Sequence, residues 1–247
     1  MINNFPLINI YKYPKSNSEL SSQMLYGEKF KIIYKKGNWL KIKTNYDNYT
    51  GYIQNKKFLT NFDPKFKISK IKSKIFIEKN QKLKKTNKFL YFGSNIEKIN
   101  ENKKFIEFEK NKWIKKKDLR KANHFEKNYS KIFKLFLNSK YLWGGKTADG
   151  IDCSSLIQIY FHYNKIFFPR DTKDQINYCK ENNKKTLLKG DIIFWKGHVG
   201  VCLNRFKFIH AYGPRKKVLI MPTNLTIQHI KSTSQLIVKK VSNINTY

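Results

Sequence analysis

The chain has 247 residues, with 51 Lys and Arg against 17 Asp and Glu, and a formal net charge of +34 at pH 7. Its hydrophobic content of 40% and aromatic content of 15% predict folded domains rather than a disordered chain. No apolar run reaches the ~18 residues that a membrane-spanning helix requires, so we expect no membrane span. The basic excess is spread along the whole chain, and the abundant Lys, Asn, Ile, Phe and Tyr share A- and T-rich codons. We therefore expect no specific nucleic-acid partner, although a lysine-rich surface attracts polyanions at low salt.

The ends and the cysteines indicate the compartment. The first residues lack a basic start followed by a long apolar run, so the sequence shows no secretory signal. Cys153, Cys179 and Cys202 are too few and too widely spaced for a disulfide framework or a paired metal site. A cytoplasmic location is the prediction.

Residues 1–62 are expected to form a small all-β domain. Short alternating segments occur at 7–10, 29–34 and 39–44, and Gly and Asn turns separate them. Strands this short with no helical pattern between them suggest a small barrel.

Residues 63–122 repeat this plan loosely. Tyr26-Gly27-Glu28, Trp39 and Gly51-Tyr52-Ile53 are echoed by Phe92-Gly93-Ser94, Phe105-Ile106 and Trp113-Ile114. A period near 60 residues predicts a second, degenerate copy of the domain, with a linker at 61–64.

Residues 123–247 change character. Apolar spacing predicts a helix over 127–138, a helix from Cys153 and a helix containing Gln175 and Tyr178. A strand over 192–195 and a hairpin of 198–203 with 206–211 follow. Helices followed by antiparallel strands make this an α+β domain.

The chemistry centres on Cys153. A turn rich in glycine delivers this thiol to the start of a helix, with Asp152 as a suitable N-cap and Ser154 in the first turn. The positive end of the helix dipole is expected to lower the thiol pKa, and nearby backbone N–H groups could hold an oxyanion. This pattern is typical of a cysteine nucleophile rather than of a thiol packed in a core.

His198 and His210 complete the pattern. They lie twelve positions apart in the predicted hairpin and share parity, so an odd loop would place them opposite each other on one face of the sheet. One imidazole could then act as base toward the thiol while the other orients it. The remaining histidines and cysteines have no comparable context, and without a His-x-x-x-His or carboxylate cluster we expect no metal and no cofactor.

Two resemblances follow from these motifs. The first 122 residues resemble bacterial SH3-like domains, as one good and one degenerate copy. Residues 123–222 resemble the NlpC/P60 family of peptidoglycan hydrolases through six ordered motifs: Tyr141-Leu-Trp-Gly-Gly, Asp152-Cys-Ser, Pro169-Arg, Gly190-Asp, His198-Val-Gly-Val and Ile209-His-Ala. The whole chain looks like the γ-D-glutamyl-L-diamino acid endopeptidases of that family.

The resemblance implies a papain-like catalytic domain and a set of roles. Cys153 would be the nucleophile, His198 the base and His210 the orienting third residue. Tyr141 would help to hold the oxyanion, and Asp152 and Ser154 would contact the free amine of a substrate's terminal L-Ala. The partners would be peptidoglycan stem peptides, cleaved between D-glutamate and a diamino acid. The family usually has glycine where this chain has Ser155, so that hydroxyl is a departure.

Two other functions fit the sequence less well. A papain-like amidase or acyltransferase would share the Cys153 and His198 chemistry and differ in its pockets. A non-catalytic protein that binds cell wall or polyanions through its SH3-like domains would use the lysine-rich surface instead.

Overall fold

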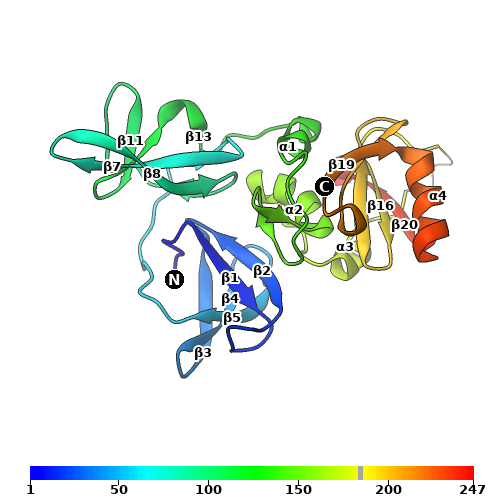
Figure 1. Cartoon of the computed structure of the whole chain (residues 1–247), viewed down its shortest axis with the longest axis horizontal. Helices are drawn as coiled ribbons and strands as arrows, with labels where there is room; N and C mark the ends of the chain where they lie inside the picture. The colour runs from blue at the N-terminus through cyan, green and yellow to red at the C-terminus, as the bar shows by residue number, and fades with distance from the viewer. Residues whose placement is uncertain (183–185) are drawn as a thin grey trace. The chain divides into compact units, whose positions relative to one another are not determined.

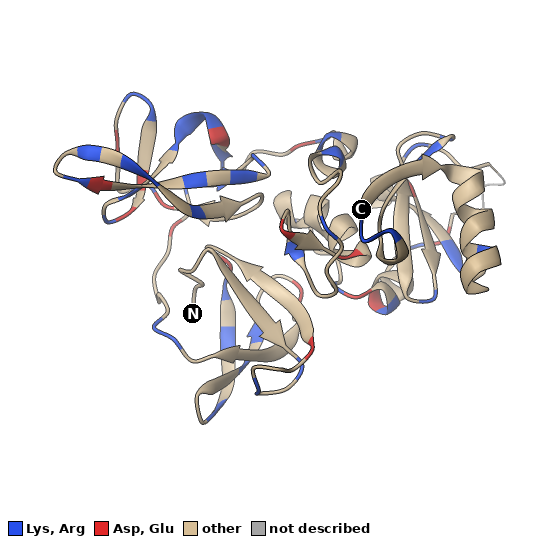
Figure 2. Ribbon diagram, in the orientation of Figure 1, with Lys and Arg blue, Asp and Glu red and all other residues tan. Residues whose placement is uncertain are grey.

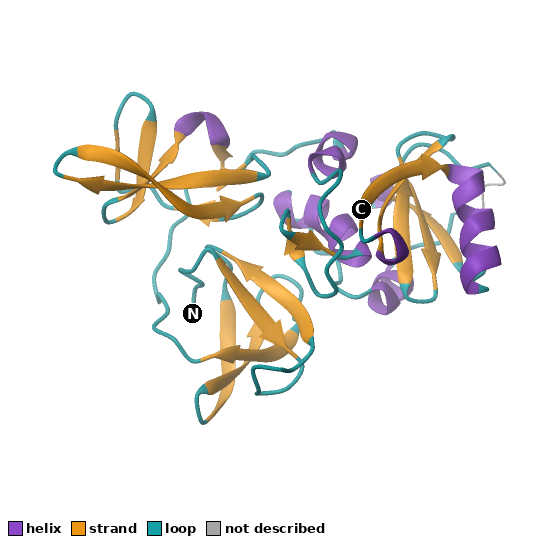
Figure 3. Ribbon diagram, in the orientation of Figure 1, coloured by secondary structure: helices purple, strands orange, loops and turns teal. Residues whose placement is uncertain are grey.

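The structure, a computed structural model, describes residues 1–182 and 186–247. The chain divides into two compact units, Met1–Glu126 and Lys127–Tyr247. Strands dominate the first unit, and the second contains both helices and strands (Figures 1 and 3).

The first half of the first unit is one five-stranded antiparallel sheet. Its strand order is β2-β1-β5-β4-β3, and its bounds are β1 Leu7–Tyr11, β2 Leu20–Leu25, β3 Phe30–Lys36, β4 Trp39–Thr44 and β5 Thr50–Gln54. Alternate apolar side chains form its core, with Ile10, Ile42 and Ile53 fully buried. The strands expected at 7–10, 29–34 and 39–44 are confirmed, and the all-β prediction for this region holds.

The second half of this unit is also all-β and carries two sheets. One sheet has the order β10-β11-β12-β7-β8 and the other has β13-β6-β9. The bounds are β6 Phe66–Ile68, β7 Lys72–Lys79, β8 Lys82–Tyr91, β9 Asn95–Ile96, β10 Asn100–Glu101, β11 Phe105–Glu109, β12 Lys112–Lys115 and β13 Leu119–Lys121. Tyr26, from the first half of the unit, packs into the core of this second half, with its ring centroid 5.4 Å from that of Phe108.

The second unit is an α+β domain. Its antiparallel sheet has the order β19-β18-β17-β16-β20, and helix α2 packs against β17 and β18. The strands are β14 Lys146–Thr147, β15 Gly150–Ile151, β16 Asp191–Trp195, β17 His198–Cys202, β18 Lys207–Tyr212, β19 Lys217–Pro222 and β20 Lys240–Asn243. The helices are α1 Tyr129–Leu135, α2 Cys153–Tyr163, α3 Thr172–Tyr178 and α4 Thr223–Ser234. The expected α+β class is confirmed.

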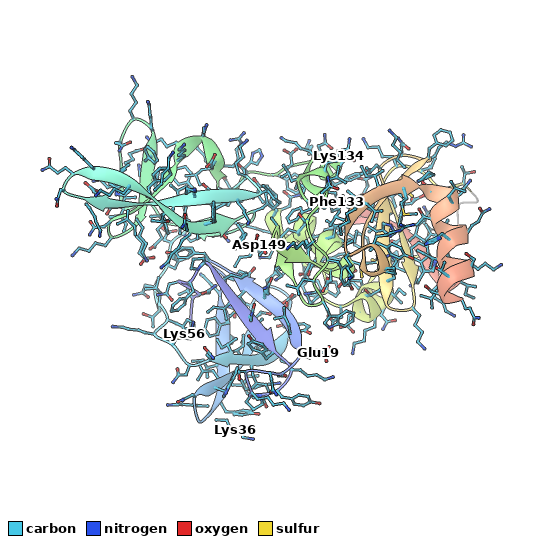
Figure 4. The ribbon with its side chains drawn as sticks, in the orientation of Figure 1. Glu19, Lys36, Lys56, Phe133, Lys134 and Asp149 are labelled. Carbon is cyan, nitrogen blue, oxygen red and sulfur yellow. The ribbon has the colours of Figure 1, made fainter. Side chains whose placement is uncertain are left out.

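Helix α1 is shorter than the sequence predicted. The side chain of Asn128 accepts a hydrogen bond from the backbone N–H of Lys131 and begins the helix, and Asn138, with φ +64, turns the chain away beyond its end. Phe133 is fully buried and the neighbouring Lys134 is exposed, as an amphipathic helix requires (Figure 4). The observed helix therefore covers only the centre of the range 127–138 that the sequence predicted.

Across the described part of the chain, no helix has the length and apolar character needed to cross a membrane.

Candidate active site

The nucleophile candidate begins helix α2. Cys153 is the first helical residue, and the Asp152 carboxylate caps the helix by accepting a 2.8 Å hydrogen bond from the backbone N–H of Ser155. Chain reversal before the cap is tight because a Cβ on Gly145 would lie 3.0 Å from the carbonyl oxygen of Leu142. The sequence prediction of a helix starting at Cys153 is confirmed.

The Asp152 carboxylate also joins three separate motifs. Arg170 binds it through both guanidinium nitrogens, with Nη1–Oδ1 at 3.1 Å and Nη2–Oδ2 at 2.6 Å. The backbone N–H of Gly144 donates to Oδ2 at 2.9 Å, and the Ser154 hydroxyl donates to Oδ1 at 3.2 Å. Arg170 Nη1 further donates to Ser154 Oγ at 2.9 Å.

This network fixes the position of the Asp152 carboxylate. Five donors bind its two oxygens, and the pair is buried, with side chains of Arg170 and Asp152 only 1% and 7% exposed. Asp152 thereby holds the start of α2 in place. Its contact with a substrate amine stays a prediction.

The thiol of Cys153 is buried, with the residue only 3% exposed. Its Sγ is 3.9 Å from the carbonyl oxygen of Gly197 and 4.0 Å from the hydroxyl of Thr172. Burial, aided by the charge of Asp152, raises the pKa of the Cys153 thiol to about 11. The lowered pKa expected from the helix dipole is therefore wrong, because desolvation outweighs the dipole at a buried helix start.

A tight hairpin places the backbone beside His198 at this thiol. Trp195 pairs with His198 across the β16–β17 turn, and the same turn contains Gly197, with φ +76. The Gly197 carbonyl that borders the sulfur is thus joined directly to the His198 backbone. The hairpin therefore fixes the position of the His198 backbone, from which the imidazole extends.

The two histidines meet as the sequence parity predicted. Strands β17 and β18 pair with Cys202 opposite Phe208, so His198 and His210 lie on one face as diagonal rather than direct neighbours. Nε2 of His198 is 2.9 Å from Nδ1 of His210. The His210 ring is stacked on Tyr212 at 4.8 Å with a 12° interplanar angle, which fixes its orientation.

Both imidazoles are held neutral. Burial lowers the pKa of His198 to about 4. Burial and the neighbouring histidines His198 and His229 lower the pKa of His210 to about 2. The His210 side chain is fully buried, and its Nε2 has no hydrogen-bond partner among the described residues.

Tyr141 lies beside the same site. The backbone N–H of Tyr141 donates to the carbonyl of Lys216, and its ring is 3.5 Å from where a Cβ on Gly213 would stand. Burial, with the nearby Cys153 and Asp152, raises the pKa of Tyr141, so its hydroxyl remains a hydrogen-bond donor at neutral pH.

Several site residues were missed by sequence reasoning. Arg170 was noted as a motif but not as the partner of Asp152, and Thr172 was not considered. Gly200 was also missed: a Cβ there would lie 2.8 Å from Cβ of His210 and would collide with the Phe208 ring. Its signal in the sequence is a lone glycine inside a strand, which marks close approach of a neighbouring group.

Cys179, Cys202 and His229 lie in the same domain. Cys202 is fully buried in the sheet core, as expected for a structural thiol, and Cys179 is 2% exposed. His229 lies on α4, with its ring centroid 6.1 Å from that of Tyr212. Ser155 is also fully buried, and its hydroxyl has no hydrogen-bond partner within the described ranges.

Comparison with known proteins matches both units. Residues 138–236 match the NlpC/P60 family, and residues 10–58 match the bacterial dipeptidyl-peptidase SH3 domain. A Haemophilus influenzae homologue of endopeptidase NlpC is 34% identical over 91 residues, and the chain covers 49% of its length.

Two longer matches span both regions. Dipeptidyl-peptidase 6 of Lysinibacillus sphaericus is 26% identical over 233 residues, which cover 83% of this chain and 84% of that protein. Gamma-D-glutamyl-L-lysine dipeptidyl-peptidase of Bacillus cereus is 24% identical over 240 residues, which cover 84% and 72%. The solved structure of an NlpC/P60 family protein from Bacillus cereus aligns with a TM-score of 0.78 at 20% identity, covering 90% of this chain and 94% of that one. This likeness establishes the shared fold.

Proposed function

The chain carries an NlpC/P60 family domain preceded by a bacterial dipeptidyl-peptidase SH3 domain, and from this premise we propose that it is a cysteine peptidase. Its substrate would be a peptidoglycan stem peptide with a free N-terminal L-Ala, cleaved between D-glutamate and the diamino acid. The observation that carries the proposal is the hydrogen bond between His198 and His210 beside a thiol at a helix start.

The reaction begins with a neutral thiol and a neutral imidazole. His210 accepts from Nε2–H of His198, which leaves Nδ1 of His198 as the ring nitrogen with a lone pair for the thiol proton. As the proton transfers, Sγ of Cys153 attacks the glutamyl carbonyl and a C–S bond forms. His210, held neutral by burial, fixes the His198 tautomer and stabilises the imidazolium.

The intermediate then resolves in two steps. The proton on His198 passes to the leaving amine as the C–N bond breaks, and an acyl-enzyme remains. A water molecule gives its proton to His198 and attacks the thioester, and the Cys153 thiol is regenerated.

Two kinds of hydrogen-bond donor would stabilise the negative charge that develops on the carbonyl oxygen. Backbone N–H groups in the first turn of α2 lack intrahelical partners, and the Tyr141 hydroxyl remains protonated. Ser154, whose hydroxyl lies within the Arg170 and Asp152 network, is retained as the proposed contact for the substrate amine. Asp152 is likewise retained as a proposed contact for that amine.

The substrate assignment draws on the relatives. One is named gamma-D-glutamyl-L-lysine dipeptidyl-peptidase, and this chain matches 72% of its length at 24% identity. We extend that activity to this chain, together with a role in turnover of released stem peptides. Residues 63–122 are proposed as a second SH3-like domain and 123–247 as the catalytic domain, and the cytoplasmic location stays a prediction.

Hydrolysis of L-Ala-γ-D-Glu-diaminopimelate, followed by mass spectrometry, tests the proposal. The wild-type chain should release L-Ala-D-Glu, Cys153→Ala should release none, and Cys179→Ser should match the wild type. An N-acetylated peptide should resist cleavage because the free amine is lost. Equal turnover by Cys153→Ala would refute the assignment, and cleavage of a muramyl amide instead of the peptide would favour an amidase.

A further inference from the structure

One face of the second β-sheet of the first unit carries an ordered row of phenylalanines and lysines. Phe105 of β11 pairs with Lys115 of β12, and Lys74 of β7 pairs with Phe89 of β8. Trp113 pairs with Phe76 between β12 and β7, and the Lys115 ammonium lies 5.5 Å from the Phe76 ring centroid. Phe–Lys pairs therefore lie on both sides of the β12–β7 contact, and Lys and Arg recur along β7 and β8 in Figure 2.

Two adjoining depressions flank this row. One has a volume of about 330 Å³ and the other about 360 Å³, and both are bordered by Lys115 and Lys117. We name them the lysine hollows, after the side chains that line them: Lys72, Lys74, Lys85, Lys103, Lys104, Lys115, Lys116 and Lys117.

Carboxylates neutralise only part of the positive charge of the hollows, because Lys116 forms an ion pair with Glu101. Asp118 is the one acidic side chain among the described residues that line them, and it accepts a 2.7 Å hydrogen bond from Ser73. Across residues 1–182 and 186–247, no carboxylate forms an ion pair with Lys74, Lys85, Lys115 or Lys117. Like charges held this close repel one another, and a bound anion would relieve that repulsion.

The aromatic rings do not offer open faces. The ammonium groups of Lys72 and Lys74 lie 5.3 and 5.2 Å from the Phe89 ring centroid, and that of Lys115 lies 5.5 Å from the Phe76 centroid. Phe76 is 5% exposed and packs edge-on against Phe105 at 4.9 Å. Cations use the ring faces that nucleobases would need for stacking, so the hollows favour anionic groups without bases.

From this arrangement we propose that the lysine hollows bind a linear polyol-phosphate polymer, in which phosphodiesters alternate with short polyol segments. Two neighbouring anion sites call for at least two charges on one chain, and a phosphodiester supplies one charge per repeat. The partly buried Phe105, which lines the second hollow, offers apolar surface to the C–H groups of the connecting polyol. This ligand complements the charge of both hollows at once, and the inference does not depend on the proposed peptidase activity.

The test uses the full-length chain and poly(glycerol phosphate) as the probe, with binding measured by fluorescence anisotropy over a salt series. In the site variant, Lys74, Lys115 and Lys117 are changed to Gln, and affinity should fall at least about tenfold with a shallower dependence on salt. In the matched control, Lys35, Lys36 and Lys57 are changed to Gln, which gives the same net charge on exposed positions outside the hollows. The control should stay within about threefold of wild type because only non-specific attraction is lost.

Two further measurements control for misfolding and for binding of any polyanion. Changing the same three site lysines to Arg preserves charge and should retain binding, which separates loss of the site from misfolding; thermal unfolding of each variant checks the fold. An oligothymidylate with the same number of phosphates should bind more weakly than the polyol-phosphate. Equal loss in site and control variants, no loss in the site variant, or preferred binding of oligothymidylate would each overturn the proposal.

Discussion

Nε2 of His198 lies 2.9 Å from Nδ1 of His210. This side-chain hydrogen bond links the paired strands β17 and β18, which carry no other histidine. In the proposed mechanism His198 donates through Nε2, which leaves its Nδ1 as the ring nitrogen that exchanges a proton with the thiol. In that mechanism the His198 tautomer is set by a residue that need not touch substrate.

Removing that orienting ring should impair catalysis more than binding. His210→Ala should lower kcat/KM on the L-Ala-γ-D-Glu-diaminopimelate peptide by about 100-fold or more, mainly through kcat, because His198 loses its tautomeric control. Steady-state kinetics of His210→Ala and His210→Gln check this, with His124→Ala in the first unit as the control. A loss confined to KM would count against an orienting role for His210.

The buried histidine should also make the fold sensitive to acid. The pKa of His210 is about 2 in the folded chain and near its ordinary 6.5 in the unfolded chain, so below pH 6.5 the unfolded state binds the extra proton. Stability is complete above pH 6.5 and falls as the pH drops, by about 2 kcal/mol for this residue between pH 7 and pH 5. Denaturant unfolding at several pH values measures it, and His210→Gln should show a shallower slope; an unchanged slope would contradict the assignment.

The pH profile of activity should reflect a neutral thiol and imidazole. Because burial lowers the pKa of His198 to about 4 and raises that of Cys153 to about 11, kcat/KM should stay level from about pH 5 to pH 10. Alkylation of Cys153 by iodoacetamide should accelerate up to about pH 11, with Cys153→Ala showing the background from the buried cysteines. An acid limb near 6.5 with a thiol titrating below 8 would indicate a thiolate–imidazolium pair instead.

The buried ion pair should couple stability to the nucleophile's position. Arg170→Met leaves the Asp152 charge without its partner and should lower the free energy of unfolding by about 3–5 kcal/mol. The double variant Asp152→Asn with Arg170→Met should recover part of that loss because no unpaired charge remains. Chemical denaturation of the single and double variants measures the coupling, and additive losses would argue against it.

Two glycines beside the site should respond differently to alanine. At Gly200 a Cβ would press on His210 and Phe208, so Gly200→Ala should cost about 1–3 kcal/mol and reduce kcat by displacing the imidazole. At Gly197 a Cβ meets no atom within 4 Å, and only its φ of +76 resists substitution, at about 1–2 kcal/mol. Paired measurements of stability and kcat distinguish them, and a normal kcat for Gly200→Ala would show that the sheet yields without moving His210.

Two features of the proposed catalytic site were predictable because they depend on local rules. Asp152 before an apolar run marks a helix start, and equal parity in a hairpin places His198 and His210 on one face. Those rules act within a few residues, so both features can be predicted from the sequence alone. The observed pairing of Cys202 with Phe208 gives the β17–β18 register that places the two histidines on one face.

What the sequence could not supply depends on burial. The pKa of Cys153 follows from desolvation by the surrounding fold, and the Asp152–Arg170 pair joins segments that only tertiary structure brings together. The β7–β8 hairpin was missed for a local reason. Its two-residue turn holds Asn80 and Gln81 at φ +49 and +60, where glycine normally follows Asn, so the usual signal was absent.

The shared carboxylate of Asp152 has a consequence for engineering. Gly144 lies in the loop before the helix, Arg170 in the loop after it and Ser155 in its first turn. All three donate hydrogen bonds to the Asp152 carboxylate. Any redesign of either loop to accept a new peptide would shift the sulfur as well. Altered selectivity in this protein would thus require compensating changes on both sides of the helix start, introduced together.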